Sequence, residues 1–290
     1  MTHLRLMMSF EKEPLTALFL RLLTAAMLFL SMPGLGLADT IKIGGTGGAI
    51  GTMNLLGEAF SKVHPQAKTI LMPGLGSGGG RKALMGGAID IAVTSSAGKN
   101  SEKLDGAAAA LYARTPFVFA TSKKNPVSGL TTQEIVDIWS LKRTTWPDGS
   151  RLRLILRPAT DTDTALLKSI SPAMAEAVKS ALAREGMKSA LSDSDSADAL
   201  ETIEGALGTS SLALIISEKR SLKALAVNGV TPSPRTIADG TYPYFKSLYL
   251  LTGPKPSQAT QEFVSFVRSV RGREILGQLG HWTVEGKISP

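Results

Sequence analysis

Short apolar runs alternate with amphipathic stretches along most of the chain after residue 38. The run DTIKIGG at 39–45 has strand character, and the apolar residues that follow it recur every three or four positions, as on one face of a helix. This succession of strand, turn and helix returns several times. Further strand-like runs are TILM (69–72), IDIAV (89–93), PFVFATS (116–122), LRLIL (152–156), LALIIS (212–217) and SLYLLT (247–252). Alternating strands and helices are typical of an α/β fold.

Other segments carry boundary signals. In LTTQEIVDIW, Thr131 and Glu134 have the spacing of a capping box, which predicts a helix start. The acidic, serine-rich tract SALSDSDSADAL (189–200) is interpreted as a solvated loop with a helix cap. A calcium loop is the alternative, but the tract lacks the glycine and terminal glutamate of that motif. Residues 230–245 are predicted to form an extended, proline-rich connector. Residues 256–272 are predicted to form a helix.

Three turns stand out because each follows a predicted strand and precedes a predicted helix. They are GTGG (45–48), GSGGGR (76–81) and RPATDTDT (157–164). Unpaired backbone N–H groups at a helix start, together with the helix dipole, favour an anion there. In an α/β sheet such turns gather at the carboxyl ends of the strands, where ligands bind.

Side chains in or near these turns add further donors. Thr46, Ser77 and Ser95 supply hydroxyl groups, and Arg157 can bind two oxygen atoms with its planar guanidinium. Glycine-rich turns are often no more than turns, but three on the same kind of connection predict a cradle for an oxyanion.

Composition places the chain among globular proteins and suggests export. Its 290 residues are 43% hydrophobic and 19% charged, with a formal net charge of +8. Residues 15–38 are almost entirely apolar, with Arg21 ahead of a short apolar core and small residues near Ala38. This pattern predicts a signal peptide over residues 1–38 and a periplasmic mature protein. An uncleaved N-terminal anchor is the alternative.

Several chemistries have little support in the sequence. The chain has no cysteine and three scattered histidines, so we expect no metal site, no cofactor and no catalytic residues. The stretch GTGGAIG has one residue too many for a dinucleotide fingerprint, and GLGSGGGRKAL lacks the ending of a P-loop.

In this order, the motifs IKIGGTGG, PGLGSGGGRKAL, GGAIDIAVTSS, LTTQEIVDIWSLKRTTWPDG, LILRPATDTDT and YPYFKSLYLLT resemble those of the phosphate-type periplasmic substrate-binding proteins of ABC transporters, a type II periplasmic binding protein family. The resemblance covers nearly all of the chain after residue 38. It implies a two-lobed α/β fold with two mixed sheets flanked by helices and a hinge of crossover strands. Lobe one would comprise residues 39–122 and 229–290, and lobe two would comprise residues 123–228.

The resemblance also implies site residues in the three turns. The family's threonine in the first glycine turn falls on Thr46, with the backbone N–H of Gly47 beside it. Its serine in the second turn falls on Ser77, next to Gly78, and its arginine falls on Arg157.

Two positions depart from the family's pattern. Phosphate-binding members have an aspartate where this chain has Ser95, and a Gly-Ser-Gly-Thr turn where it has TDTDT at 160–164. A carboxylate that faces an oxyanion repels it unless one of the two carries a proton. Asp161 or Asp163 therefore either caps the helix and points away from the ligand, or accepts the proton of a protonated oxyanion. Asp161, Thr162 and Asp163 are therefore all candidate ligand-binding residues.

The sequence thus predicts a secreted, monomeric binding protein that captures a small inorganic oxyanion, with phosphate favoured, for the permease of an ABC transporter. No nucleic-acid partner is expected. An oxyanion sensor or buffering module without a transporter is the first alternative, and a secreted phosphate-ester hydrolase is the second. The choice among phosphate, sulfate, molybdate and tungstate stays open.

Overall fold

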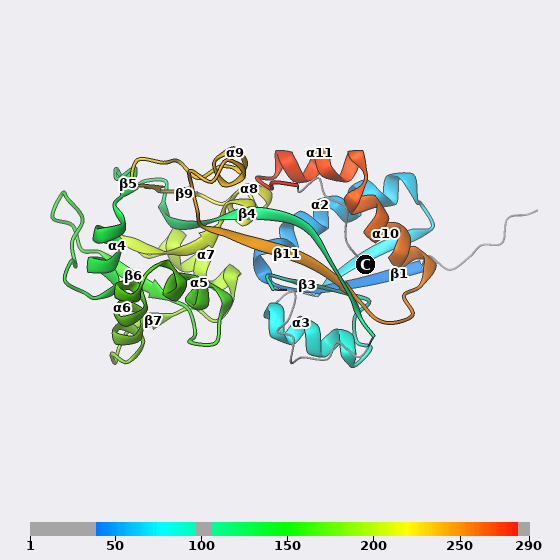
Figure 1. Cartoon of the computed structure of the whole chain (residues 1–290), viewed down its shortest axis with the longest axis horizontal. Coiled ribbons are helices and arrows are strands. Elements are labelled where there is room, and N and C mark those ends of the chain that lie inside the picture. Colours follow the sequence, from blue (N-terminus) through cyan, green and yellow to red (C-terminus); the bar gives the residue numbers. More distant parts are fainter. Residues whose placement is uncertain (1–38, 73, 97–105, 284–290) are drawn as a thin grey trace, which may run out of the picture. The chain divides into compact units, whose positions relative to one another are not determined.

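The protein is described here by a computed structural model, which covers residues 39–72, 74–96 and 106–283 (Figure 1). The predicted signal peptide lies outside these ranges. Among the described residues, none of the helices combines the length and the apolar character needed to cross a membrane.

The strands and helices alternate along most of the chain, as the apolar pattern predicts. The strands are β1 (Asp39–Gly45), β2 (Ala67–Met72), β3 (Ile91–Thr94), β4 (Ala108–Ser122), β5 (Gly129–Leu130), β6 (Arg153–Leu156), β7 (Lys188–Ser189), β8 (Ala206–Ser211), β9 (Leu222–Ala224), β10 (Ala226–Val227) and β11 (Phe245–Thr252). The helices are α2 (Gly47–Val63), α3 (Gly76–Met85), α4 (Thr132–Trp139), α5 (Thr162–Ile170), α6 (Pro172–Leu182), α7 (Asp193–Thr202), α8 (Leu212–Ser217), α9 (Pro234–Ala238), α10 (Gln258–Arg268) and α11 (Val270–Gln278).

The sheet is mixed, and helices flank it. Its hydrogen-bonding order is β2-β1-β3-β11-β4-β8-β6-β7, with β9 also paired to β4, and β5 pairs separately with β10. Strand β1 runs parallel to β2 and β3, and β6 runs parallel to β7 and β8. Strands β4 and β11 lie side by side, antiparallel, and connect these two parallel groups (Figure 1). The two mixed sheets expected from the resemblance are therefore joined through β4 into one hydrogen-bonded path.

Buried hydrophobic side chains form two large clusters on either side of this connection. Leu56 and Phe263 belong to one cluster, which packs α2 and α10 onto β1. Trp139 and Tyr242 belong to the other, which packs α4 and α6 around β6 and β8. Strand β4 contributes buried residues to both clusters, as a strand that passes between two cores must.

The predicted lobe limits stay a prediction, and the packing bears on one of them. Ile237 and Tyr242 are buried with Trp139, in the cluster that contains most of residues 123–228. This packing favours a second crossing within β11 rather than at residue 229.

Several predictions of local structure are confirmed and some are wrong. The capping box at Thr131 and Glu134 is present at the start of α4. LALIIS, predicted as a strand, is the short helix α8, and the connector 230–245 contains the helix α9. The glycine-rich segment at 76–80 is not a loop, because α3 already begins at Gly76.

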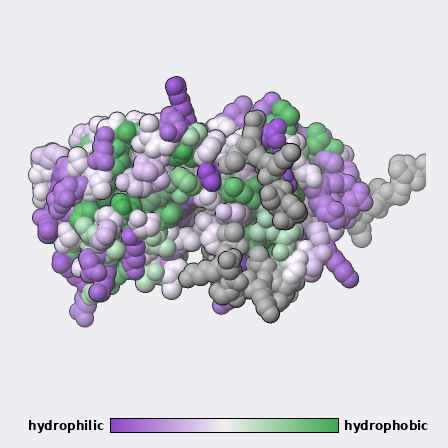
Figure 2. All heavy atoms as spheres, viewed as in Figure 1, coloured by the Kyte–Doolittle hydropathy of each residue, from purple (hydrophilic) through white to green (hydrophobic). Residues whose placement is uncertain are grey.

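The surface mixes polar and apolar residues. On the face drawn in Figure 2, hydrophilic and hydrophobic residues are interspersed, and no single hydrophobic area covers it. Large apolar side chains that are exposed include Val63, Ile70, Met72, Met85, Leu191, Ile216 and Val270. Scattered apolar side chains of this kind are ordinary on globular proteins.

Candidate functional site

The first predicted turn forms the N-terminus of α2. Thr46 is the N-cap residue, and its backbone N–H donates to the Val93 carbonyl at the end of β3, with a distance of 2.8 Å. This bond ties the start of α2 to the neighbouring strand. Thr46 is buried, so the donors at this helix start lie inside the protein.

These donors hold a carboxylate of the chain itself. Asp193, the first residue of α7, places its Oδ2 atom 3.0 Å from the Gly48 backbone nitrogen and 3.3 Å from the Thr46 hydroxyl oxygen. Gly47 faces the same side chain, because a Cβ atom built on it would lie 3.0 Å from the Cβ of Asp193. The start of α2 thus binds an anionic group, and that group is a side chain of the protein.

The second turn brings three predicted hydroxyl groups together. The hydroxyls of Ser77, in the first turn of α3, and Ser95, just after β3, are 3.0 Å apart, and the Ser95 backbone N–H donates to the Ser77 hydroxyl. The Ser95 hydroxyl donates in turn to Thr162 in the first turn of α5, over 3.0 Å. This chain of hydroxyls links the β1–β3 part of the sheet to the β6 part.

The guanidinium of Arg157 lies buried just after β6. Its Nη2 atom is 2.7 Å from Asp161 Oδ2 and 4.0 Å from Asp193 Oδ1, and its Nη1 atom donates to the Ala190 carbonyl. The remaining donor, Nε, is buried and has no hydrogen-bond partner among the described residues. An acceptor placed beside Nε would satisfy it.

The two aspartates of the TDTDT turn have different roles. Asp161 is the N-cap of α5, because its Oδ1 atom accepts from the Asp163 backbone N–H over 2.8 Å while Oδ2 binds Arg157. The capping interpretation is therefore confirmed for Asp161. Asp163 is almost fully buried, forms an ion pair with Lys246 and accepts a hydrogen bond from the Thr209 hydroxyl.

Lys246 connects these groups from β11. Besides Asp163, its Nζ atom lies 3.5 Å from Asp193 Oδ1. Burial opposes the charge on Lys246, but the carboxylates of Asp163 and Asp193 outweigh it, so the pKa of Lys246 lies above its usual value. Burial likewise disfavours the carboxylate of Asp193, but Lys246 and Arg157 outweigh that effect and hold its pKa below the usual range.

The cluster therefore joins three carboxylates and two cations. The carboxylates belong to Asp161, Asp163 and Asp193, and the cations belong to Arg157 and Lys246. With every group ionised the cluster carries one negative charge. A further anion is repelled there unless a carboxylate moves away or becomes protonated.

A cavity of about 580 Å³ opens beside these residues. The predicted residues Ser77, Gly78, Asp161 and Thr162 contribute to its lining. The rest of the described lining comprises Gly76, Gly79, Arg81, Lys82, Ser96, Pro158, Thr160 and Leu191. Asp161 is the member of the charged cluster that belongs to this lining.

Thr46, Arg157, Asp161 and Asp163 belong to this cluster or contact it, and Ser95 bonds Ser77 and Thr162. The predicted set lacked two charged members of the cluster. Asp193 belongs to the tract that was interpreted as a solvated loop, but it is the first residue of α7 and is turned inward. Lys246 interrupts an apolar strand, YFKSLYLLT, and a single cation in such a run is the signal that could have found it.

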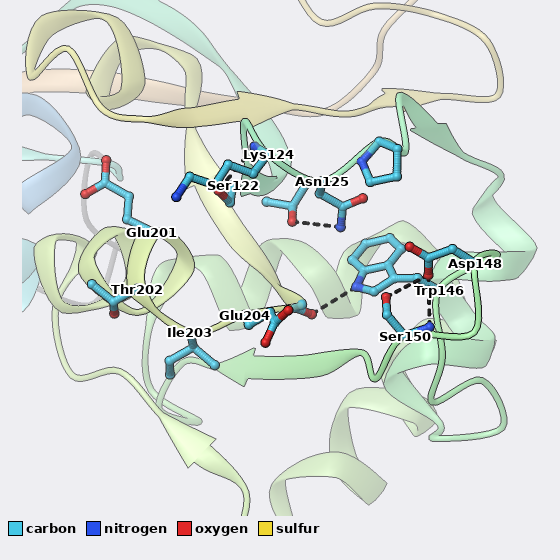
Figure 3. A pocket seen from close by; sticks show the side chains of 13 residues that line it. Ser122, Lys124, Asn125, Trp146, Asp148, Ser150, Glu201, Thr202, Ile203 and Glu204 are labelled. Atoms are coloured by element: carbon cyan, nitrogen blue, oxygen red, sulfur yellow. Dashed lines mark hydrogen bonds between the residues drawn. The ribbon is translucent and has the colours of Figure 1, made fainter.

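A second cavity, of about 450 Å³, lies elsewhere (Figure 3). Trp146 forms part of its wall and donates from Nε1 to the Gly205 carbonyl. Three carboxylates, of Asp148, Glu201 and Glu204, contribute to its lining along with Lys124. This balance of charge is poorly suited to an anion, so the cluster around Arg157 is the better oxyanion site.

Comparison with known proteins identifies the family. A family described as "PBP superfamily domain" matches residues 33–271, which is most of the chain. The chain belongs to the PBP superfamily. Membership confirms the resemblance inferred from the motifs at the level of the superfamily.

Solved structures share the fold of this chain. A phosphate ABC transporter substrate-binding protein with bound phosphate, from Clostridium perfringens, is similar over 85% of this chain and 100% of its own, with a TM-score of 0.73 and 21% identity. An ABC-type phosphate transport receptor from Vibrio cholerae is similar over 84% of this chain and 100% of its own, with a TM-score of 0.59 and 21% identity. The two-lobed α/β fold is thereby confirmed.

Curated relatives match over a shorter stretch. The phosphate-binding protein PstS 2 of Streptococcus pneumoniae serotype 4 is 27% identical over 89 residues, which is 31% of this chain and 31% of that protein. The chain therefore spans about a third of the length of the curated relatives that it matches.

Proposed function

We propose that this PBP superfamily member is a solute-binding protein that captures a small oxyanion, with phosphate as the first candidate, and supplies it to an ABC transporter. One observation carries the proposal. The N-terminus of α2 already binds a negatively charged oxygen, that of Asp193, with the donors of Thr46 and Gly48. Donors that bind a carboxylate in this way also suit phosphate or sulfate.

Further donors lie in or near the second and third predicted turns. The Nε group of Arg157 is buried without a partner in the described part of the chain, and Ser77, Ser95 and Thr162 supply hydroxyl groups nearby. Each charge-assisted hydrogen bond contributes about 1.5 to 3 kcal/mol. Micromolar affinity corresponds to about 8 kcal/mol, which five or six such bonds can supply after the cost of association.

The comparisons support phosphate as the ligand and transport as the role. The relatives named above are described as a phosphate-binding protein, a phosphate transporter substrate-binding protein and a phosphate transport receptor. By this proposal the protein binds without catalysis, works as a monomer outside the cytoplasm after removal of residues 1–38, and presents its ligand to a membrane permease. Nothing in the described residues favours the sensor or the hydrolase over this role.

Calorimetric titration tests the proposal. The purified protein, freed of bound anions, is titrated with phosphate and then with sulfate, molybdate and tungstate. We expect saturable binding of phosphate. Arg157→Lys keeps the positive charge but loses the forked donors, so its affinity should fall by about ten- to a hundredfold.

Arg153→Lys is the matched control, because Arg153 begins the strand β6 that Arg157 follows, is exposed, and donates to the Glu204 carbonyl. Its affinity should equal that of the wild type. Absence of binding for all four anions, in protein shown to be folded and ligand-free, would rule out the oxyanion function.

A further inference from the structure

The donors at the start of α2 are occupied by a side chain of the protein. The single Oδ2 atom of Asp193 accepts from both Gly48 N–H and the Thr46 hydroxyl. Each donor has one proton to give, and a well-formed hydrogen bond uses it for one acceptor. An oxyanion that binds these donors must first remove the Asp193 carboxylate from them.

The position of Asp193 shows that this contact is not a by-product of helix capping. Helix α7 is capped by Ser192 and Asp195, whose side chains and backbone groups bond reciprocally. Asp193 takes no part in that capping box. Its side chain reaches to α2, where Gly47 leaves room that a larger residue would fill.

Two buried cations hold the carboxylate in place from its other side. Lys246 Nζ is 3.5 Å and Arg157 Nη2 is 4.0 Å from Asp193 Oδ1. Asp193 therefore has the surroundings of a bound anion, with helix N-terminal donors on one oxygen atom and two positive groups near the other.

We infer that Asp193 is a built-in competitor of the oxyanion, and thereby a residue that sets affinity and selectivity. This inference rests on the proposed function. A ligand binds the α2 donors by displacing the Asp193 carboxylate, which then turns away from α2. Anions with two charges and several acceptor oxygens, such as hydrogen phosphate and sulfate, displace it. Monocarboxylates resemble the group they would have to displace and gain little.

Asp193→Asn tests the inference. The amide keeps the size of the side chain but binds the α2 donors without a negative charge, so phosphate and sulfate should both bind about tenfold tighter or more. Asp198→Asn is the matched control, because Asp198 lies on the same helix, is exposed and pairs with Arg220. Its affinities should equal those of the wild type.

The pattern across these three proteins separates the two ideas. Phosphate binding by wild type and Asp198→Asn without a gain in Asp193→Asn overturns the competitor role and leaves the proposed function intact. Weaker phosphate binding together with tighter sulfate binding in Asp193→Asn also overturns it, because the carboxylate would then accept the ligand's proton. Absence of phosphate binding in all three proteins overturns the proposed function and this inference with it.

A measurement on the wild type covers the case in which Asp193→Asn does not fold. Nuclear magnetic resonance can follow the Gly48 amide and the Asp193 side-chain carboxyl carbon while phosphate is added. Both resonances should shift in step with saturation, since the Gly48 donor passes from Asp193 to phosphate. Saturation that leaves the Asp193 carboxyl resonance unchanged would overturn the inference.

Discussion

At the scale of residues, the buried cation of Lys246 compensates the charges of neighbouring carboxylates. Its side chain is 2% exposed and faces two carboxylates, those of Asp163 and Asp193. A buried ion pair adds little stability compared with apolar side chains of the same size. Removal of one partner, however, leaves the other as an uncompensated buried charge, which is strongly destabilising. Lys246 therefore helps to compensate the buried charges of both Asp163 and Asp193.

Lys246→Met tests this role. It should lower the free energy of unfolding by about 3 to 5 kcal/mol, because Asp163 and Asp193 lose their shared cation. Addition of Asp163→Asn should recover part of the loss. Urea denaturation at neutral pH measures both variants.

Lys179→Met is the control, since the pair of Lys179 with Glu176 is exposed. Its effect should stay within about 0.5 kcal/mol. A loss in Lys246→Met no larger than this would show that the buried carboxylates are compensated by other groups.

At the scale of elements, the close contact of α3 with β1 positions Ser77 next to Ser95. An ideal Cβ atom on Gly80 would lie 2.7 Å from the Gly45 Cα atom, so the helix packs directly on the strand backbone. Gly45 itself has a φ of 137°, which side-chain-bearing residues rarely adopt. These two glycines bring the start of α3, with Ser77, next to Ser95 at the end of β3.

Gly80→Ala should lower the free energy of unfolding by about 1 to 3 kcal/mol, because the added methyl group forces α3 away from β1. Gly277→Ala is the control, since Gly277 is also helical but its Cβ would meet no atom within 4 Å. That change should raise stability by about 0.4 to 1 kcal/mol. Thermal or urea denaturation compares the two, and equal effects would contradict the close contact.

At the scale of the whole molecule, residues 281 and 282, which follow α11, contact both β4 and α2. The backbone of Trp282 bonds that of Arg114 on β4, and the His281 ring nitrogen Nε2 lies 3.0 Å from the Thr52 hydroxyl on α2. His281 is buried, and burial lowers its pKa to about 3. The folded protein therefore keeps this histidine neutral.

This burial makes global stability depend on pH. An unfolded histidine binds a proton near pH 6.5, whereas folded His281 does so only near pH 3. Its contribution to stability is complete above pH 6.5 and falls as the pH drops from 6.5 towards 3. The slope approaches about 1.4 kcal/mol per pH unit.

Urea denaturation between pH 7.5 and 4.5 tests this dependence. In His281→Asn the free energy of unfolding should lose the part of its pH dependence that comes from His281. The comparison variant His64→Asn, which changes a half-buried histidine, should keep that part. His64→Asn also removes the partner of Glu262, whereas the other carboxylates keep their surroundings in that variant. Identical slopes in wild type and His281→Asn would contradict the prediction.

The sequence by itself determined the features that depend on residues a few positions apart, namely the order of strands and helices and a helix cap. The spacing of apolar residues predicted the succession of strands and helices, and Thr131 with Glu134 predicted the start of α4. Local patterns also predicted that a helix follows each of β1, β2 and β6, although α3 begins at Gly76, within the predicted second turn. Helix periods and caps depend on hydrogen bonds and contacts within a few positions, so the sequence displays them directly.

Only the tertiary structure decided how the site is filled. Asp193 meets Gly48 from 145 residues away, and Lys246 reaches Asp163 and Asp193 because β11 lies beside β4. LALIIS, whose apolar run suits a strand or a buried helix, is the helix α8, with half of its residues buried. Contacts of this kind depend on which strands pair and in what register, because pairing decides which distant side chains meet. Local patterns therefore predicted the donors at the start of α2, and the tertiary structure decided that the Asp193 carboxylate binds them.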